Sequence, residues 1–204
     1  KRRTITFHGG EPLLAGKKFY RKALDSIGKR FEGTVSLSVQ SNLWLLDDSY
    51  IRLFKEYGVF PGTSLDGPEF VNDFQRGAGY FEKTMAGIEL LFDRGIRPGC
   101  IATFTPQSAS NYEAVFDFFV EKGIHFGIHT AIRPIGKSEN HGLFLSPAAF
   151  GDLLIGMLEL YLGNTHKIKI STLDILARNI SNGKSSLCTF SRCLGEYLAV
   201  APDG

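Results

Sequence analysis

The stretch Thr4-Ile5-Thr6-Phe7-His8-Gly9-Gly10-Glu11-Pro12 decides how this chain is interpreted. It begins as a strand, continues into two glycines, an acid and a proline, and is followed by a helical pattern. Gly9 and Gly10 remove side chains where the strand ends, so a ligand can approach bare backbone there. Pro12 pushes Glu11 towards an extended conformation, which aims its carboxylate. The turn suits a positively charged group such as an amine, although alone it equally fits an ordinary strand-to-helix turn with a surface acid.

Length and composition narrow the class of protein. The 204 residues suffice for a substantial core, and 23 basic residues nearly balance 21 acidic ones, which argues against nucleic acid as a partner. No apolar run is long enough to span a bilayer, and Lys1-Arg2-Arg3 leads into a strand rather than a signal-peptide core. Three unevenly placed cysteines do not form a secreted disulfide framework. We therefore expect a cytoplasmic protein with no nucleic-acid or membrane partner.

Strand-like and helix-like patterns alternate along most of the chain. Five strands are expected, at 4–7, 34–40, 59–65, 96–104 and 124–132. Helices are expected at 17–31, from a cap at Asp47 or Asp48 to 57, at 80–94 and at 111–122. This alternation predicts a parallel sheet with right-handed crossovers. Beyond Pro134 it is expected to stop, leaving helices at 146–162 and 172–182.

Polar side chains follow each expected strand. Because the carboxyl ends of parallel strands meet at one edge of a sheet, where such folds bind ligands, these side chains should converge. The segments are Glu11, Gln40 to Asn42, Ser64 to Asp66, Thr103 to Thr105 and His129 to Arg133. Their convergence predicts one binding pocket.

Three motifs resemble those of one enzyme family. The turn at Glu11 resembles that of radical S-adenosylmethionine (AdoMet) enzymes, in which Gly-Gly-Glu-Pro after the second barrel strand holds the methionyl amine. Ser64-Leu65-Asp66-Gly67-Pro68, followed by Asp73 and Arg76, resembles the matching stretch of anaerobic sulfatase-maturating enzymes and their peptide-modifying relatives. The end of the chain, from 188 to 204, is similar to the start of their cysteine-rich SPASM extension. The resemblance covers nearly the whole chain, in order.

The resemblance implies a fold and a domain division. It implies an α/β fold, a partial (β/α)6-type barrel that lacks its first strand and carries the start of a cysteine-rich extension. We expect the barrel over 1–137, a helical connection over 138–183 and the start of the extension over 184–204. Both ends look cut, which favours a fragment over a degenerate relative. A chain without its first strand should expose a sheet edge.

The resemblance also assigns residues to AdoMet. Ser64 and Arg76 resemble the pair that holds the methionyl carboxylate, a task suited to a hydroxyl and a guanidinium fork. Without the motif they would be a cap at a strand end and a solvated charge in a loop. The full set of expected cofactor-binding residues is Gly9, Gly10, Glu11, Pro12, Ser64 and Arg76.

The sequence does not assign a single role to several other residues near these motifs. Asp66 and Asp73 are expected to shape the loop, since Asp-Gly-Pro is a turn sequence. His8 could face the ligand or be a satisfied histidine at a strand end. The segment 40–43 matches the family's Gln-Thr-Asn-Gly only in Gln and Asn, because Ser41 and Leu43 replace the other two residues.

The cysteines suggest a metal site that this chain does not complete. Cys188 and Cys193 have four residues between them in the SPASM-like segment, and thiolates suit iron–sulfur clusters or zinc. Two thiolates cannot fill a four-thiolate site, and two free thiols are the alternative. Cys100, within an apolar strand, is expected in the core. The CxxxCxxC motif that holds the family's catalytic 4Fe-4S cluster does not occur in the sequence.

The resemblance implies an enzyme that uses AdoMet, 4Fe-4S clusters and a reductant to abstract hydrogen from a peptide or protein side chain, as in sulfatase maturation. This chain alone is expected to be inactive, and no residue matches a catalytic acid or base. One alternative is a non-catalytic binding scaffold that has lost the cluster. Another is a phosphate-using barrel enzyme, which is disfavoured because Glu11 occupies the glycine turn where an anion would require amides.

Overall fold

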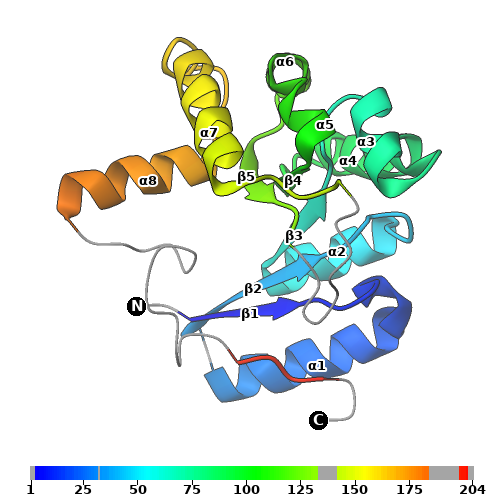
Figure 1. Ribbon diagram of the computed structural model, residues 1–204. Coiled ribbons are helices and arrows are strands. Elements are labelled where there is room, and N and C mark those ends of the chain that lie inside the picture. The colour runs from blue at the N-terminus through cyan, green and yellow to red at the C-terminus, as the bar shows by residue number, and fades with distance from the viewer. Residues whose placement is uncertain (1–2, 32, 133–141, 184–197, 202–204) are drawn as a thin grey trace.

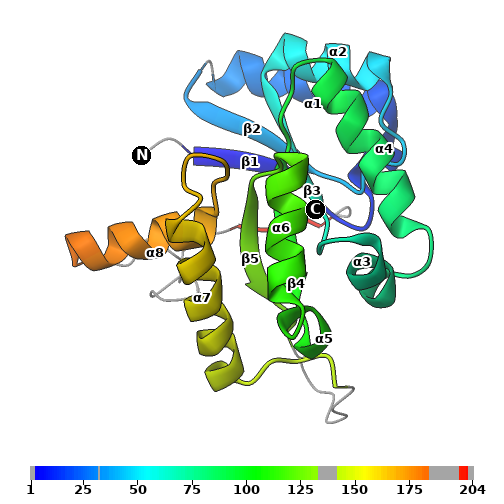
Figure 2. The same cartoon turned by 90° about the horizontal axis from the view of Figure 1, so that it is seen from above.

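Five parallel strands form one sheet in their order along the chain. The computed structural model describes residues 3–31, 33–132, 142–183 and 198–201. The strands are β1 (Arg3–Phe7), β2 (Val35–Gln40), β3 (Val59–Ser64), β4 (Gly99–Phe104) and β5 (Phe126–Thr130). Figures 1 and 2 show that the sheet curls into a half barrel with the helices outside it. The expected α/β partial barrel is confirmed.

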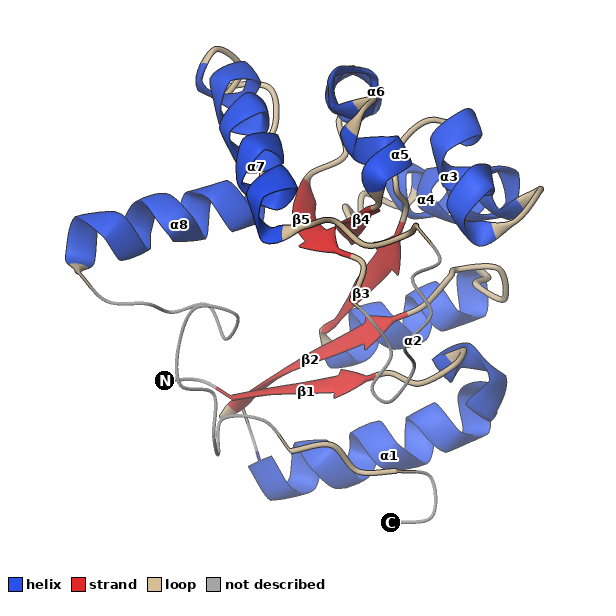
Figure 3. Ribbon diagram, in the orientation of Figure 1, coloured by secondary structure: helices blue, strands red, loops and turns tan. Residues whose placement is uncertain are grey.

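Helices connect the strands throughout (Figure 3). They are η1 (Pro12–Ala15, a 3-10 helix), α1 (Gly16–Phe31), α2 (Asp48–Tyr57), α3 (Glu69–Arg76), α4 (Tyr80–Asp93), α5 (Pro106–Ala109), α6 (Tyr112–Lys122), α7 (Pro147–Leu162) and α8 (Ser171–Asn182). Asp47 caps α2, because its carboxylate accepts from the N–H groups of Ser49 and Tyr50. The six longer helices begin and end close to their predicted bounds, whereas α3, α5 and η1 were not predicted. None of the described helices is both long and apolar enough to cross a membrane.

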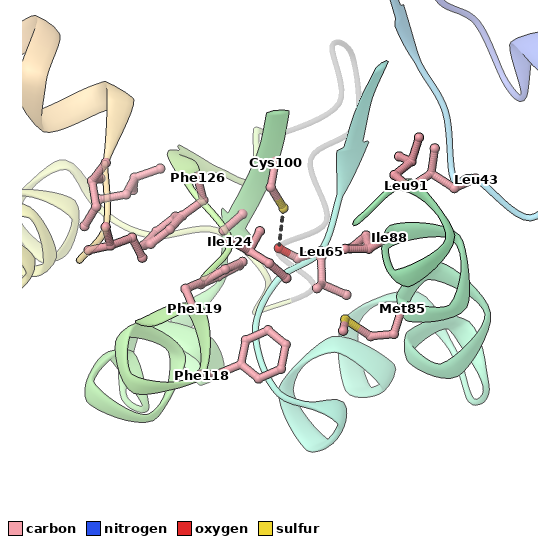
Figure 4. Packing of buried hydrophobic residues seen from close by; sticks show 14 of the residues in the cluster. Leu43, Leu65, Met85, Ile88, Leu91, Cys100, Phe118, Phe119, Ile124 and Phe126 are labelled. Carbon is pink, nitrogen blue, oxygen red and sulfur yellow. Dashed lines mark hydrogen bonds between the residues drawn. The ribbon is translucent and has the colours of Figure 1, made fainter. Parts of the chain in front are cut away.

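The core lies between the convex face of the sheet and the helices. Phe119 of α6 stacks on Phe126 of β5 with ring centroids 4.2 Å apart, as Figure 4 shows for this part of the core. Cys100 is buried and its Sγ donates to the Leu65 carbonyl at 3.7 Å. Burial raises the pKa of the Cys100 thiol to about 12, so the thiol stays neutral. The prediction that Cys100 is a core residue is confirmed.

The concave face of the sheet carries mostly polar or small residues, with Phe60 and Ile101 as apolar exceptions. Successive strand residues point to opposite faces, and the residues that alternate with the buried ones are mostly hydroxylic or small. Thr6 Oγ1 and Ser38 Oγ, on neighbouring strands, lie 2.7 Å apart on this face. The hydroxyl-bearing positions in this set are Thr4, Thr6, Ser36, Ser38, Ser64 and Thr103. A mostly polar concave face provides a surface for a ligand rather than a second apolar core.

The outer edge of β5 pairs with one further residue. Phe126 forms an isolated parallel bridge with Ile170, and its N–H donates to the Lys169 carbonyl at 3.1 Å. Thr172 Oγ1 accepts from the Ile128 N–H at 2.8 Å. Apart from this one-residue bridge, the described residues beyond β5 form helices α7 and α8 and no further strand, which agrees with the prediction that the alternation stops beyond Pro134. At the other edge, β1 pairs only with β2 among the described residues, which provides the expected exposed edge.

Thr63 offers a test of this packing. It lies on β3, is fully buried, and its Oγ1 has no partner among the described residues. Valine keeps the shape and removes the unsatisfied hydroxyl, so Thr63→Val should raise the free energy of unfolding by about 1–2 kcal/mol in urea denaturation. Thr84 is the matched control, because it is equally buried but accepts from Trp44 Nε1 at 3.1 Å. Thr84→Val should lower stability by about 1 kcal/mol, and a loss in Thr63→Val would contradict the packing described.

Candidate functional site

The Glu11 carboxylate is held in place where β1 ends. Glu11 is extended, with φ −135° and ψ 106°, as Pro12 predicts, and it caps η1. Oε1 accepts from the Leu13 N–H at 2.9 Å and the Ser41 hydroxyl at 2.8 Å, and Oε2 accepts from the Asn42 N–H at 2.9 Å. The carboxylate therefore joins the ends of β1 and β2. Oε2 makes one of these bonds and retains an acceptor position for a ligand.

The backbone beside Glu11 is open. Gly9 and Gly10 are exposed, and a Cβ added at either position would meet nothing within 4 Å. Gly9 also has φ +134°, which L side chains rarely adopt. The Gly9 N–H donates to Nδ1 of His8 at 2.7 Å, so a neutral His8 carries its proton on Nε2. A ligand can thus reach bare backbone next to a fixed carboxylate, as the sequence predicts.

The turn after β2 supports both Glu11 and Ser64. Ser41 is buried, and its hydroxyl donates to Glu11 and accepts from the Leu43 N–H at 2.9 Å. Gln40 Nε2 donates to Ser64 Oγ at 3.1 Å, which leaves the Ser64 proton free to be donated. The role that the sequence left open for this segment is therefore support of the site.

Arg76 lies in a different setting from the one predicted. It ends α3 rather than lying in a loop, because Pro68 precedes a helix that the sequence analysis missed. Its Nε and Nη2 donate to Oδ2 and Oδ1 of Asp66 at 2.6 and 2.8 Å. Asp66 is 1% exposed and Arg76 is 22% exposed, so the guanidinium borders the site and its partner lies beneath. Arg76 also lies over the Tyr80 ring, 5.3 Å from its centroid.

The two acids of the motif have different roles. Asp73 accepts from the N–H groups of Gly79 and Phe81 at 2.6 and 2.8 Å, which agrees with the prediction that it shapes the loop. Burial acts to raise the pKa of Asp73, but these N–H groups and the Asn72 amide outweigh it and lower the pKa. Asp66, by contrast, binds the Arg76 side chain. The sequence could not separate the two, because α3 was not predicted.

Gln75 is the residue that sequence reasoning missed. Its Nε2 donates to Asp66 at 2.8 Å and to the Thr103 carbonyl at 2.9 Å, and its Oε1 accepts from Thr105 Oγ1 at 2.8 Å. Thr103 in turn donates its N–H to Asp66 at 2.8 Å. Together with the Glu11 and Ser64 contacts, these bonds link the carboxyl ends of β1 to β4 along one edge. Within this network the structure brings together the predicted residues of the four segments.

The remaining predicted residues contribute less. His129 lies at the end of β5 opposite Thr103 in register, and burial lowers its pKa. Arg133, Cys188, Cys193 and Gly204 lie outside the described residues. Over 3–31, 33–132, 142–183 and 198–201, no cluster of three or more His, Cys, Asp or Glu residues could hold a metal ion. The predicted metal ligands therefore remain a prediction.

Comparison with known proteins identifies the sequence relatives. Residues 1–119 match the model of the Radical SAM superfamily. A protein of Methanothermobacter thermautotrophicus is 41% identical over 177 residues, which cover 86% of this chain and 68% of that protein. The serine-type anaerobic sulfatase-maturating enzyme of Klebsiella aerogenes is 29% identical and the cysteine-type enzyme of Clostridium perfringens strain 13 is 24% identical. Both alignments cover 98% of this chain, but only 51% and 57% of those enzymes.

Solved structures show the same fold. The enzyme anSMEcpe with bound AdoMet superimposes with a TM-score of 0.80 at 24% identity, over 92% of this chain and 52% of that one. Streptococcus suis SuiB gives a TM-score of 0.65 at 16% identity, over 82% of this chain and 38% of that one. With its half barrel and the family match over 1–119, the chain belongs to the radical S-adenosylmethionine superfamily and is similar to the anaerobic sulfatase-maturating enzymes.

Proposed function

We propose that this chain binds AdoMet at the carboxyl-end edge of its half barrel, as part of an enzyme that abstracts hydrogen from a peptide or protein side chain. One observation carries the proposal: the open Gly9-Gly10 backbone lies beside the Glu11 carboxylate, which three donors fix in place. A methionyl amine would find there one free acceptor position on Oε2 and the unobstructed backbone of the turn. A side chain at either glycine would fill this space.

Ser64 and Arg76 fit the other end of the amino acid moiety. Ser64 Oγ accepts from Gln40 and has its own proton to donate, and Arg76 is a cation bordering the site. A hydroxyl and a guanidinium together provide charge-assisted hydrogen bonds to a carboxylate. We therefore assign the methionyl carboxylate to these two residues.

Relatives support a peptide or protein substrate. Several are named as sulfatase-maturating enzymes, and solved structures contain anSMEcpe with AdoMet and the Cp18Cys peptide, and SuiB with the precursor peptide SuiA. The mostly polar concave face next to the cofactor-binding edge is where we place the substrate. When bound, AdoMet and its cluster supply the one-electron chemistry that removes a hydrogen atom from the substrate.

The sequence also bears on what the chain does alone. It contains no CxxxCxxC motif, so we propose that it binds AdoMet without cleaving it, and that cleavage requires cluster ligands and a reductant from outside these 204 residues. We place the enzyme in the cytoplasm and assign Cys188 and Cys193 to an iron–sulfur site. A non-catalytic scaffold would bind AdoMet with the same residues. An upstream CxxxCxxC in the source gene would decide against the scaffold.

Isothermal titration of AdoMet into the chain tests the binding proposal. We expect Arg76→Ala and Ser64→Ala each to weaken binding at least tenfold, because each removes a hydrogen bond to a charged group worth about 1.5–3 kcal/mol. Far-UV circular dichroism controls for unfolding, which matters for Arg76→Ala because it leaves Asp66 buried and unpaired. Inorganic phosphate should not protect the chain against thermal unfolding. Unchanged affinity in both variants would contradict the site.

A further inference from the structure

We propose that Asp66 is a positioning residue that fixes the Arg76 guanidinium for the AdoMet carboxylate, an inference that rests on the proposed function. The two residues form a fork-to-fork pair, with Arg76 Nε 2.6 Å from Asp66 Oδ2 and Nη2 2.8 Å from Oδ1. Such a pair fixes the plane of the guanidinium as well as its position.

Asp66 has no capacity left for a ligand. Besides the two bonds from Arg76, its oxygens accept from Gln75 Nε2 and from the Thr103 N–H, both at 2.8 Å. These four donors use the roughly four lone-pair sites of a carboxylate. The side chain is only 1% exposed. Its action on a ligand must therefore pass through Arg76.

Arg76 keeps donors for a ligand. One N–H of Nη2 and the Nε N–H are directed at Asp66, and a further hydrogen bond joins the guanidinium to Tyr80, which leaves two N–H groups of the five. The Tyr80 ring packs against the guanidinium, 5.3 Å from centroid to Cζ. Burial acts to lower the pKa of Arg76, but the bonds and charge of Asp66 outweigh it and raise the pKa. The free side of a fixed, charged fork is thus available at the edge where Ser64 ends β3.

Asp66 is itself anchored to three elements. It follows β3 directly, the Thr103 N–H comes from β4, and Gln75 comes from α3. Gln75 also bonds the Thr103 carbonyl and Thr105, so it cannot swing away with Arg76. Asp73, in the same segment, accepts instead from two backbone N–H groups and from Asn72. The contrast makes Asp73→Asn a matched control, which perturbs the loop without touching the guanidinium.

The test compares AdoMet with decarboxylated AdoMet, which lacks the carboxylate. Isothermal titration of both ligands is performed on the unsubstituted chain, Asp66→Asn, Tyr80→Leu and Asp73→Asn. The unsubstituted chain should bind AdoMet about 10–100-fold more tightly than the decarboxylated ligand. This is the difference in affinity that charge-assisted hydrogen bonds to the carboxylate would provide. Asp66→Asn should reduce this ratio about tenfold, which leaves the contribution of the Ser64 hydroxyl, and Tyr80→Leu should reduce it less. Asp73→Asn should leave the ratio unchanged.

Each outcome is decisive. If Asp66→Asn weakens the binding of AdoMet and of decarboxylated AdoMet equally, Asp66 has only a structural role. The inference then fails, while the proposed function stands. If the unsubstituted chain binds neither ligand, the proposed function fails and the inference with it. Should Asp66→Asn unfold, Arg76→Lys keeps the test valid, because a lysine ammonium retains the positive charge opposite Asp66 but not the planar fork that Asp66 holds. An unchanged ratio in a folded Arg76→Lys would then overturn the inference.

Discussion

Replacing Gly87 by alanine should destabilise this protein by about 1–3 kcal/mol, although alanine is the better helix former by about 1 kcal/mol. Gly87 is buried in α4, where a Cβ would lie 2.5 Å from Leu43 Cβ and 3.1 Å from the Leu43 carbonyl oxygen. Leu43 is buried, and Figure 4 shows it beside Leu91, which belongs to the same helix as Gly87. The contact involves backbone, so it cannot be relieved by a rotamer change. Urea denaturation measures the effect.

A double-mutant cycle identifies the cause. Among the described residues, Leu43 alone of the non-glycine residues has a positive φ, of +67°. This backbone conformation costs a leucine about 1–2 kcal/mol. Leu43→Gly gives up a buried side chain and destabilises by itself, but it removes the Cβ that an alanine at 87 would meet, so Gly87→Ala should cost less in the Leu43→Gly background, with a coupling energy above about 1 kcal/mol. Gly28→Ala is the control: Gly28 is an exposed residue of α1 with nothing within 4 Å of an added Cβ, so alanine should stabilise by about 0.5–1 kcal/mol. If the stability losses of Leu43→Gly and Gly87→Ala were simply additive in the double variant, the contact between the two residues would be contradicted.

This pair also shows what the sequence could not predict. The partial match at 40–43 left the role of the segment open, because Leu43 replaces a glycine. The structure resolves it: the turn keeps its positive φ at Leu43, and Gly87, 44 positions later, provides the room. A compensation between two residues distant in sequence leaves no local signal in a single chain. Only the folded arrangement reveals it.

The strands and longer helices were predictable because each has a period and an end signal. The alternation in Val35–Gln40, the Asp47 cap and the glycine after Tyr57 each specify local structure without help from the rest of the fold. Helix α3 lacked such a signal, since Asp-Gly-Pro reads as a turn and the helix spans only eight residues. That omission placed Arg76 in a loop and hid its partner. The pairing at Ile170 was missed because tertiary contact alone creates it.

Glu11→Gln should cost both stability and AdoMet affinity. A glutamine amide has one accepting oxygen, whereas the carboxylate accepts from Leu13 and Ser41 on one side and from Asn42 on the other. If the amide oxygen faces Leu13, the NH₂ group meets the Asn42 N–H. If the amide flips, the NH₂ group meets the Leu13 N–H instead. Either orientation leaves a backbone donor unpaired, so we expect a loss of about 1–3 kcal/mol in urea denaturation.

The same substitution removes the negative charge proposed to attract the methionyl amine, so AdoMet should bind at least tenfold more weakly in isothermal titration. Glu56→Gln is the control, because Glu56 forms an exposed ion pair with Arg21, with side chains 51% and 56% exposed. Such pairs contribute little, and that variant should change stability by less than about 0.5 kcal/mol and leave AdoMet binding unaltered. The two readouts separate two roles. A destabilised variant with full affinity would make Glu11 only the brace between β1 and β2, and the amine would then depend on the open backbone of Gly9 and Gly10.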